Sequence, residues 1–214
     1  MFFLSEDIDN NGDIYIPPVP AGLRNNCKEG NWLFSDRILA NRESDWLIMG
    51  FCPFFGDLGK KHQDKHWGQI WIYPLTEGIP KMLFVSYLKT FGYQSFRDEY
   101  NLLKAENKIA TQQVWHATFI STANEHGDFY KLAWKPTDAA PEIIELSQKV
   151  EAAMKANLER LIDLEGTKEM VNLFGLKPEE KQAAIAQFKA KKAQALAPQN
   201  QPQNAQQLAP ANPF

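Results

Sequence analysis

Four stretches between residues 66 and 134 are dense in aromatic and β-branched side chains, and they limit the possible folds more than any other part of the chain. They cover residues 66–73, 82–89, 113–120 and 128–134. Such residues suit a pleated, half-buried surface, so each stretch predicts a β-strand. Aromatic rings fall on both parities of these strands, while a closed sheet buries only one face. We therefore expect some rings to face outward.

The overall composition predicts one domain with appendages. The chain has 214 residues, of which 44% are hydrophobic and 23% are charged, enough to bury a sizeable core. The net charge is −3, and residues 28–136 carry 13 basic and 12 acidic side chains. A site for a polyanion must therefore be a local groove, because no region of the chain is basic as a whole.

Compartment signals are few. The chain has two cysteines, Cys27 and Cys52, which is too few for a disulfide framework. The first residues lack the positive segment of a secretory signal and turn acidic at once, and no apolar run approaches the roughly 20 residues of a membrane span. We expect a cytoplasmic protein without membrane contact.

The chain divides into four parts by composition. Residues 1–29 predict an extended N-terminal arm, in which Ile14 to Ile16 form a short edge strand. Residues 30–136 predict a β-rich domain, 141–195 a helical segment, and 196–214 a disordered tail rich in Gln, Pro, Asn and Ala. The expected strands are 30–39, 44–52, 66–73, 82–89, 113–121 and 128–135, and the expected helices are 95–106, 142–164, 167–174 and 178–195.

This order predicts an α+β fold built on a β-rich, OB-like barrel with one inserted helix. In an OB-type barrel a helix interrupts the sheet before its closing hairpin, as the helix over 95–106 does here. Ser95 is the expected N-cap of that helix. A β-sandwich with a covering helix would give a similar pattern, so both architectures stay open.

Outward-facing rings beside lysines are typical of surfaces that hold unpaired bases, because bases stack on the rings and lysines follow the phosphates. The stacking candidates are Trp67, Trp71, Tyr73, Phe84, Tyr87 and Trp115. The candidate phosphate contacts are Lys60, Lys61, Lys65, Lys81, Lys89 and Arg97. The alternative interpretation is that the rings form the core and that the lysines lie on a solvated loop.

Motifs for catalysis or metal binding are weak. His62 and His66 lie in an expected loop near Cys52, but no Cys-x-x-Cys pair completes a tetrahedral zinc site. The chain contains no Gly-rich phosphate loop, no Gly-x-Ser-x-Gly elbow and no His-Glu-x-x-His helix. We expect no enzyme activity, no cofactor and no metal. A metal-dependent nuclease with scattered carboxylates is a third, unsupported reading.

The tail ends in Asn212-Pro213-Phe214, which places an aromatic ring and a terminal carboxylate on a long tether. Such an end suits capture by a partner's pocket with a basic rim. A strand-rich barrel, aromatic strands, a low-complexity tail and a final Pro-Phe together resemble the single-stranded DNA-binding proteins of bacteria, phages and plasmids. That resemblance implies an OB-fold that holds single strands without sequence preference, and a tail that recruits replication and repair enzymes.

The resemblance is one of layout, covering roughly residues 30–135 and 198–214. Asn212 stands where that family has isoleucine, the family's acidic run before the ending is missing, and the helical segment 141–195 lies outside its pattern. Pro213 and Phe214 are the tail residues expected to bind a partner. The resemblance implies that this partner is a replication or recombination protein.

Two functional hypotheses follow. The first is sequence-tolerant binding of single-stranded nucleic acid, DNA in the first instance, in replication or recombination. The second is a protein–protein assembly module without a nucleic-acid role, in which the β-domain and the helix over 142–164 join a larger particle and the exposed aromatics are interface anchors. The choice between DNA and RNA and the presence of a homo-oligomer stay open.

Overall fold

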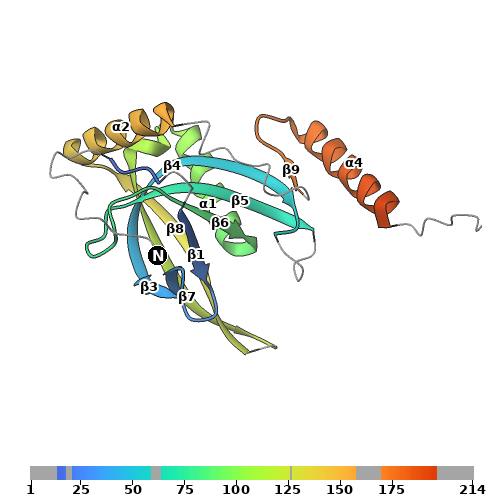
Figure 1. Cartoon of the computed structure of the whole chain (residues 1–214), viewed down its shortest axis with the longest axis horizontal. Coiled ribbons are helices and arrows are strands. Elements are labelled where there is room, and N and C mark those ends of the chain that lie inside the picture. The colour runs from blue at the N-terminus through green and yellow to red at the C-terminus, as the bar shows by residue number, and fades with distance from the viewer. Residues whose placement is uncertain (1–13, 18–20, 59–63, 126, 158–169, 197–214) are drawn as a thin grey trace, which may run out of the picture.

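The computed structural model describes residues 14–17, 21–58, 64–125, 127–157 and 170–196, and its centre is one strongly curled sheet (Figure 1). The strands are β1 (Ala21–Asn26), β2 (Asn31–Phe34), β3 (Arg37–Ala40), β4 (Glu43–Gly56), β5 (Lys65–Pro74), β6 (Phe84–Lys89), β7 (Gln113–Asn124), β8 (Gly127–Asp138) and β9 (Met170–Asn172). The helices are α1 (Thr90–Ala105), the 3₁₀ turn η1 (Ala110–Gln112), α2 (Pro141–Ala156) and α4 (Pro178–Leu196).

Eight strands run across the sheet in the order β3-β2-β1-β6-β5-β4-β7-β8. Neighbouring strands are antiparallel except β1 and β6, which are parallel and pair over two residues only. α1 connects β6 to β7, two strands that lie on opposite sides of the β4–β5 pair in the sheet. The mixed α/β class and the curled sheet agree with the expected strand-rich barrel at this coarse level.

β4 is the strand that bends the sheet. Its 14 residues pair with β5 along most of their length, and the register shifts between Ile48 and Gly50. Such a bulge bends a strand and increases its twist. On its other side, β4 pairs with β7 through residues 43–46 and with β9 through residues 54–56. One strand thus belongs to both halves of the sheet.

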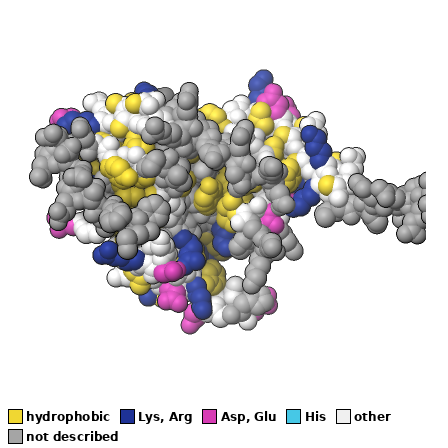
Figure 2. All heavy atoms as spheres, viewed as in Figure 1, with side chains coloured by type: hydrophobic (Ala, Val, Ile, Leu, Met, Phe, Trp, Pro, Cys, Tyr) yellow, Lys and Arg dark blue, Asp and Glu magenta, His cyan; other side chains and the backbone are white. Residues whose placement is uncertain are grey.

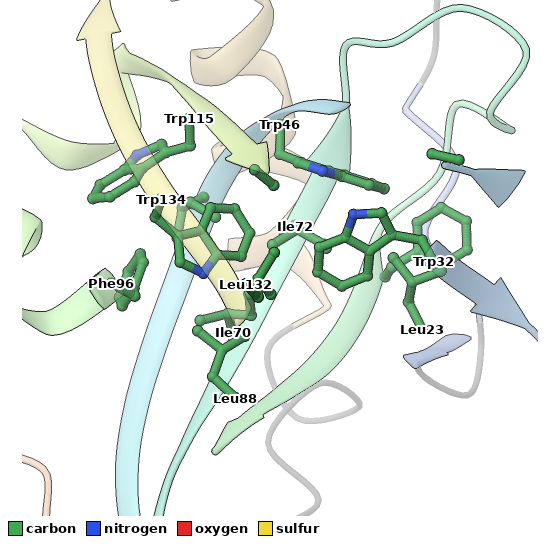
Figure 3. Close-up of a cluster of buried hydrophobic side chains, with 14 of the residues drawn as sticks. Leu23, Trp32, Trp46, Ile70, Ile72, Leu88, Phe96, Trp115, Leu132 and Trp134 are labelled. Atoms are coloured by element: carbon green, nitrogen blue, oxygen red, sulfur yellow. The ribbon is translucent and has the colours of Figure 1, made fainter. Parts of the chain in front are cut away.

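The two ends of the sheet meet around Trp32. This indole of β2 lies 5.6 Å from the ring of Phe119 in β7 and 6.0 Å from that of Trp134 in β8, measured between ring centroids. The backbone N–H of Tyr130 also donates a hydrogen bond to the carbonyl of Cys27, at 2.7 Å. Figure 3 shows four indoles, from β2, β4, β7 and β8, gathered inside the curl.

α1 fills the inside of the curl through Phe96. The Phe96 ring lies 4.8 Å from that of Trp115 and 6.0 Å from that of Trp134. The helix begins at Thr90, with Lys89 as its N-cap, so the prediction that Ser95 caps it was wrong. Ser95 instead lies within the helix, where its hydroxyl accepts a hydrogen bond from the Trp134 N–H at 3.0 Å. Ser95 therefore ties the middle of the helix to β8.

The outer face of the sheet has its own apolar layer. Val150 and Met154 of α2 pack on outward-facing residues of β4, β5 and β6. Ile14 and Ile16 pack on the same layer, and Tyr15 forms a parallel bridge with Met82. These residues contact the domain as expected, but through an isolated bridge and not as an edge strand. Residues 21–26, expected in the arm, form β1 of the sheet.

Several expected elements have different bounds or types. The expected strand 30–39 is split into β2 and β3, because Ser35 has a positive φ of 54° and turns the chain. Residues 170–172, expected within a short helix, form β9 because they pair with the end of β4. The helices expected at 142–164 and 178–195 correspond to α2 and α4. Two stretches lie outside the described residues: residues 158–169, and the expected tail from residue 197 to residue 214.

α4 packs on the far end of β4 and β5. Its Phe188 ring lies 6.1 Å from that of Phe55. Lys192 forms an ion pair with Asp64 at 2.7 Å, just before the start of β5. Lys189 Nζ also lies over the Phe55 ring, 5.2 Å from its centroid.

Candidate functional site

The expected stacking residues of β5 share one face, the outer one, as their parity predicts, but they are covered. Trp71 and Tyr73 are 7% and 4% exposed and belong to the layer beneath α2 and residues 14–16. Trp67 is 4% exposed, and its indole N–H donates to the Gly56 carbonyl at 3.0 Å. The expectation that these three rings lie open to solvent was wrong. α2 and residues 14–16 pack over Trp71 and Tyr73, and Trp67 is stacked with Phe54 of β4.

Two other candidates lie inside the curl. Phe84 and Trp115 are fully buried in the inner core, and the Trp115 indole N–H donates to the Ala110 carbonyl at 3.0 Å. Neither ring has a surface on which a base could stack. Tyr87 differs from the other five, because its side chain is only half-buried.

Tyr87 lines a cleft of about 400 Å³ between β1, β6 and β5. The strands β1 and β6 pair only at residues 21–22 and 84–85, and beyond that point they are bridged by a side chain. Asn25 Nδ2 donates to the Tyr87 carbonyl at 2.8 Å and to Ser86 Oγ at 3.2 Å. The cleft is lined by Gly22, Leu23, Arg24, Asn25, Leu58, Trp67, Val85, Tyr87 and Lys89.

This cleft carries two cations and an oriented tyrosine. Arg24 and Lys89 are exposed and form no ion pair with any described residue. The Tyr87 hydroxyl accepts a hydrogen bond from Gln69 Nε2 at 3.2 Å, which fixes the ring against β5. Three predicted residues, Trp67, Tyr87 and Lys89, therefore meet here, together with Arg24. Residue spacing alone did not indicate Arg24, which was placed in the N-terminal arm.

The remaining predicted cations do not converge on the cleft. Lys65 is exposed at the start of β5. Lys81 Nζ donates to the carbonyls of Pro74 and Leu75, at 3.1 and 3.2 Å, so it closes the β5–β6 turn. Arg97 lies on α1 and pairs with Asp98 at 3.0 Å. Lys60, Lys61, Pro213 and Phe214 lie outside the described residues.

A second, apolar cleft of about 560 Å³ lies along β4. Between its pairings with β7 and β9, β4 pairs with β5 on one side only over residues 47–52, within the described part of the chain. The Pro53 carbonyl already accepts a hydrogen bond from the Leu173 N–H at 2.9 Å. Ile109 and Phe174 line this cleft and are 55% and 66% exposed. An open strand edge beside apolar side chains is a surface to which another strand can add.

His116 has two partners that the sequence did not reveal. Its Nδ1 lies 2.6 Å from Asp45 Oδ1, and its Nε2 lies 2.8 Å from Thr137 Oγ1. Asp45, His116 and Thr137 follow the carboxylate–imidazole–hydroxyl order of a hydrolytic triad. The His116 and Asp45 side chains are, however, 40% and 46% exposed. Such a relay works in a water-excluding site. We assign these residues the role of joining β4, β7 and β8.

Three further features bear on metal binding, thiol chemistry and membrane crossing in the described residues. Within the ranges that the structure describes, no three His, Cys, Asp or Glu side chains are placed to hold a metal ion. Cys27 and Cys52 are free thiols, and burial raises the pKa of each above its ordinary value. No described helix is long and apolar enough to cross a membrane.

Comparison of the chain with protein-family models, with curated proteins and with solved structures finds no match. The two clefts and their side chains are therefore the features from which a function can be proposed.

Proposed function

We propose that this chain binds single-stranded nucleic acid through an OB-type barrel, at the cleft between β1, β5 and β6. The strand order β6-β5-β4-β7-β8, with α1 between β6 and β7, supports an OB-type connectivity. In that reading β4, β5 and β6 are the first three strands, and β7 and β8 are the closing hairpin. The N-terminal strands β1 to β3 then occupy the gap between the third and fifth strands.

The position of the cleft is the observation that carries this proposal. OB-folds bind oligonucleotides on the face of their second and third strands, beside the loop that joins the first two. The corresponding strands are β5 and β6, and their outer face holds the cleft. Leu58, which follows β4 in the corresponding loop, lines the same cleft.

The chemistry of the cleft suits a single strand better than a duplex. Tyr87 supplies one half-exposed ring, on which an unpaired base would stack. Arg24 and Lys89 supply positive charge on either side of it for the phosphates. With one ring and two cations, the cleft would hold only a few nucleotides, without sequence preference and with strong dependence on salt.

The test is a titration of fluorescently labelled oligo-dT and oligo-U, followed by anisotropy, with the variant Arg24→Gln/Lys89→Gln. We expect the double variant to bind more weakly than the wild type, and the slope of log K against log salt to fall by about 1.4, since each phosphate contact contributes roughly 0.7 for single strands. The charge-matched control is Lys149→Gln/Lys155→Gln, on the exposed side of α2. Equal affinities for the two double variants would reject the cleft as the site.

A second candidate function, protein–protein assembly, is favoured by the open edge of β4 and the apolar cleft beside it. In this reading an extended segment of a partner adds to residues 47–52, and Phe174 packs on it. The mass of the protein in solution by light scattering, with and without Phe174→Glu, tests self-assembly. A monomer in both cases would exclude a homo-oligomer through this surface. Recruitment of replication or recombination proteins through Pro213 and Phe214 remains a proposal.

A further inference from the structure

Basic side chains from three elements surround the start of β5, on the face opposite the cleft. They are His66 of β5, Arg97 of α1, and Lys181 and Lys189 of α4, and we call them the basic surface. Burial lowers the pKa of His66, and the nearby charges of Arg97, Lys189 and Lys181 lower it further. The imidazole therefore lies in a positive potential that reaches it from both helices.

Aromatic rings hold these cations in place. Lys189 Nζ lies 5.2 Å from the centroid of the Phe55 ring, and that ring lies 5.1 Å from the His66 ring. The guanidinium of Arg97 lies 5.8 Å from the centroid of the Tyr93 ring, which is half-buried. Phe55 is buried and Tyr93 is half-buried, so the surface offers positive charge beside one partly exposed ring. Basic side chains beside a ring can contact nucleic acids without sequence preference.

α4 presents Lys181 and Lys192 on the side that faces the protein, whereas Lys189 is exposed. Lys181, Ile185 and Phe188 follow at helical spacing, and all are half-buried. Apart from Lys192, which pairs with Asp64, the lysines of this face form no ion pair with any described residue. Figure 2 shows Lys and Arg side chains beside hydrophobic ones over α4.

Arg97 is paired with Asp98 at 3.0 Å, so the positive charge of the basic surface that has no ion pair with a described residue is that of Lys181 and Lys189. Such a local excess of positive charge attracts anionic ligands. The proposed cleft and the basic surface lie at the same end of β5. Trp67 lines the cleft, and His66 precedes it in the strand, so their side chains point to opposite faces. Both sites therefore lie near the start of β5 at Lys65, one on each face of the strand.

We infer that the basic surface binds the phosphates of the same single strand that occupies the cleft, and that α4 is therefore part of the nucleic-acid interface. This inference rests on the proposed function. It gives α4, which has no counterpart in the family that the sequence layout resembles, a direct role in binding. It also implies that the protein binds a strand longer than the cleft alone can hold.

The test compares short and long oligo-dT on the full chain, with Lys181→Gln/Lys189→Gln against the control Lys149→Gln/Lys155→Gln. OB-folds occupy about 4–16 nucleotides, so oligomers of about 5 and about 20 nucleotides separate the cleft from the extended path. Glutamine keeps the length of the lysine stem, and circular dichroism checks that the helices are retained. We expect the longer oligomer to lose on the order of twentyfold in affinity at 0.1 M salt, roughly fivefold per lost phosphate contact.

The outcomes separate the inference from the proposed function. If the wild type binds neither oligomer, the proposed function fails and the inference fails with it. If Arg24→Gln/Lys89→Gln weakens binding of both oligomers, but Lys181→Gln/Lys189→Gln behaves as its control does, only the inference is overturned. A loss confined to the longer oligomer supports the inference.

Discussion

Tyr87 is the side chain on which the proposed binding mode depends most, because it is the half-exposed ring of the cleft. We predict that Tyr87→Ala weakens oligo-dT binding by about 1–3 kcal/mol, the contribution of one stacked base. Tyr87→Phe keeps the ring and removes the hydroxyl, which accepts a hydrogen bond from Gln69. It should bind nearly as the wild type does in the same anisotropy titration. Equal losses for the two variants would show that stacking is not the interaction involved.

Gly68 is the position where a single methyl group should do most harm to the inner face. A Cβ there would lie 2.7 Å from Phe51 Cε2 and 2.8 Å from Tyr93 Cδ2. Overpacking of this kind costs about 1–3 kcal/mol, so we predict that Gly68→Ala lowers the free energy of unfolding by that amount. Gly22→Ala is the control, because no atom lies within 4 Å of its Cβ. Urea unfolding of both variants measures the difference.

His66 reports the electrostatics of the basic surface without any ligand. Its pKa is lowered below the usual 6.5 by burial and by three cations. The folded protein therefore binds fewer protons at this group than the unfolded chain does, and the stability from it is lost as the pH falls below 6.5. We predict that Lys181→Gln/Lys189→Gln raises the pKa of His66, measured by NMR titration of its ring protons. An unchanged pKa would mean that α4 does not lie against His66 in solution.

At the scale of elements, α1 is the part that the inner core needs most. Phe96 is fully buried and contacts the rings of Phe51, Tyr100, Trp115 and Trp134. Truncation of a buried phenylalanine costs about 3–5 kcal/mol, and we predict this loss for Phe96→Ala. Leu102→Ala on the same helix, at a residue that is 57% exposed, should change stability little. Thermal unfolding of the two variants makes the comparison.

Strands were predicted well where their residues are buried by the sheet itself. The stretches 66–73 and 113–121 correspond closely to β5 and β7, because their aromatic and β-branched residues pack on one or both faces. Elements set by distant partners were missed. β9 exists because 170–172 pair with β4, and the start of α1 is five residues before Ser95, whose hydroxyl bonds to β8. Neither partner can be read from the local sequence.

At the scale of the whole molecule, the sequence indicated which face each ring points to, but not what covers that face. Trp71 and Tyr73 do point away from the inside of the curl, as their parity requires. They are buried because α2, which begins only at Pro141, lies over them. Arg24 was missed for the same reason, since only the parallel pairing of β1 with β6 brings it to Lys89.

Hydrogen–deuterium exchange with and without a saturating short oligo-dT tests the central claim most directly, because it locates the bound strand. The account predicts that protection increases in residues 22–25 and 85–89, the two sides of the cleft. Protection confined to residues 47–52 and 172–174, along the apolar cleft of β4, or no protection in any peptide, would contradict it.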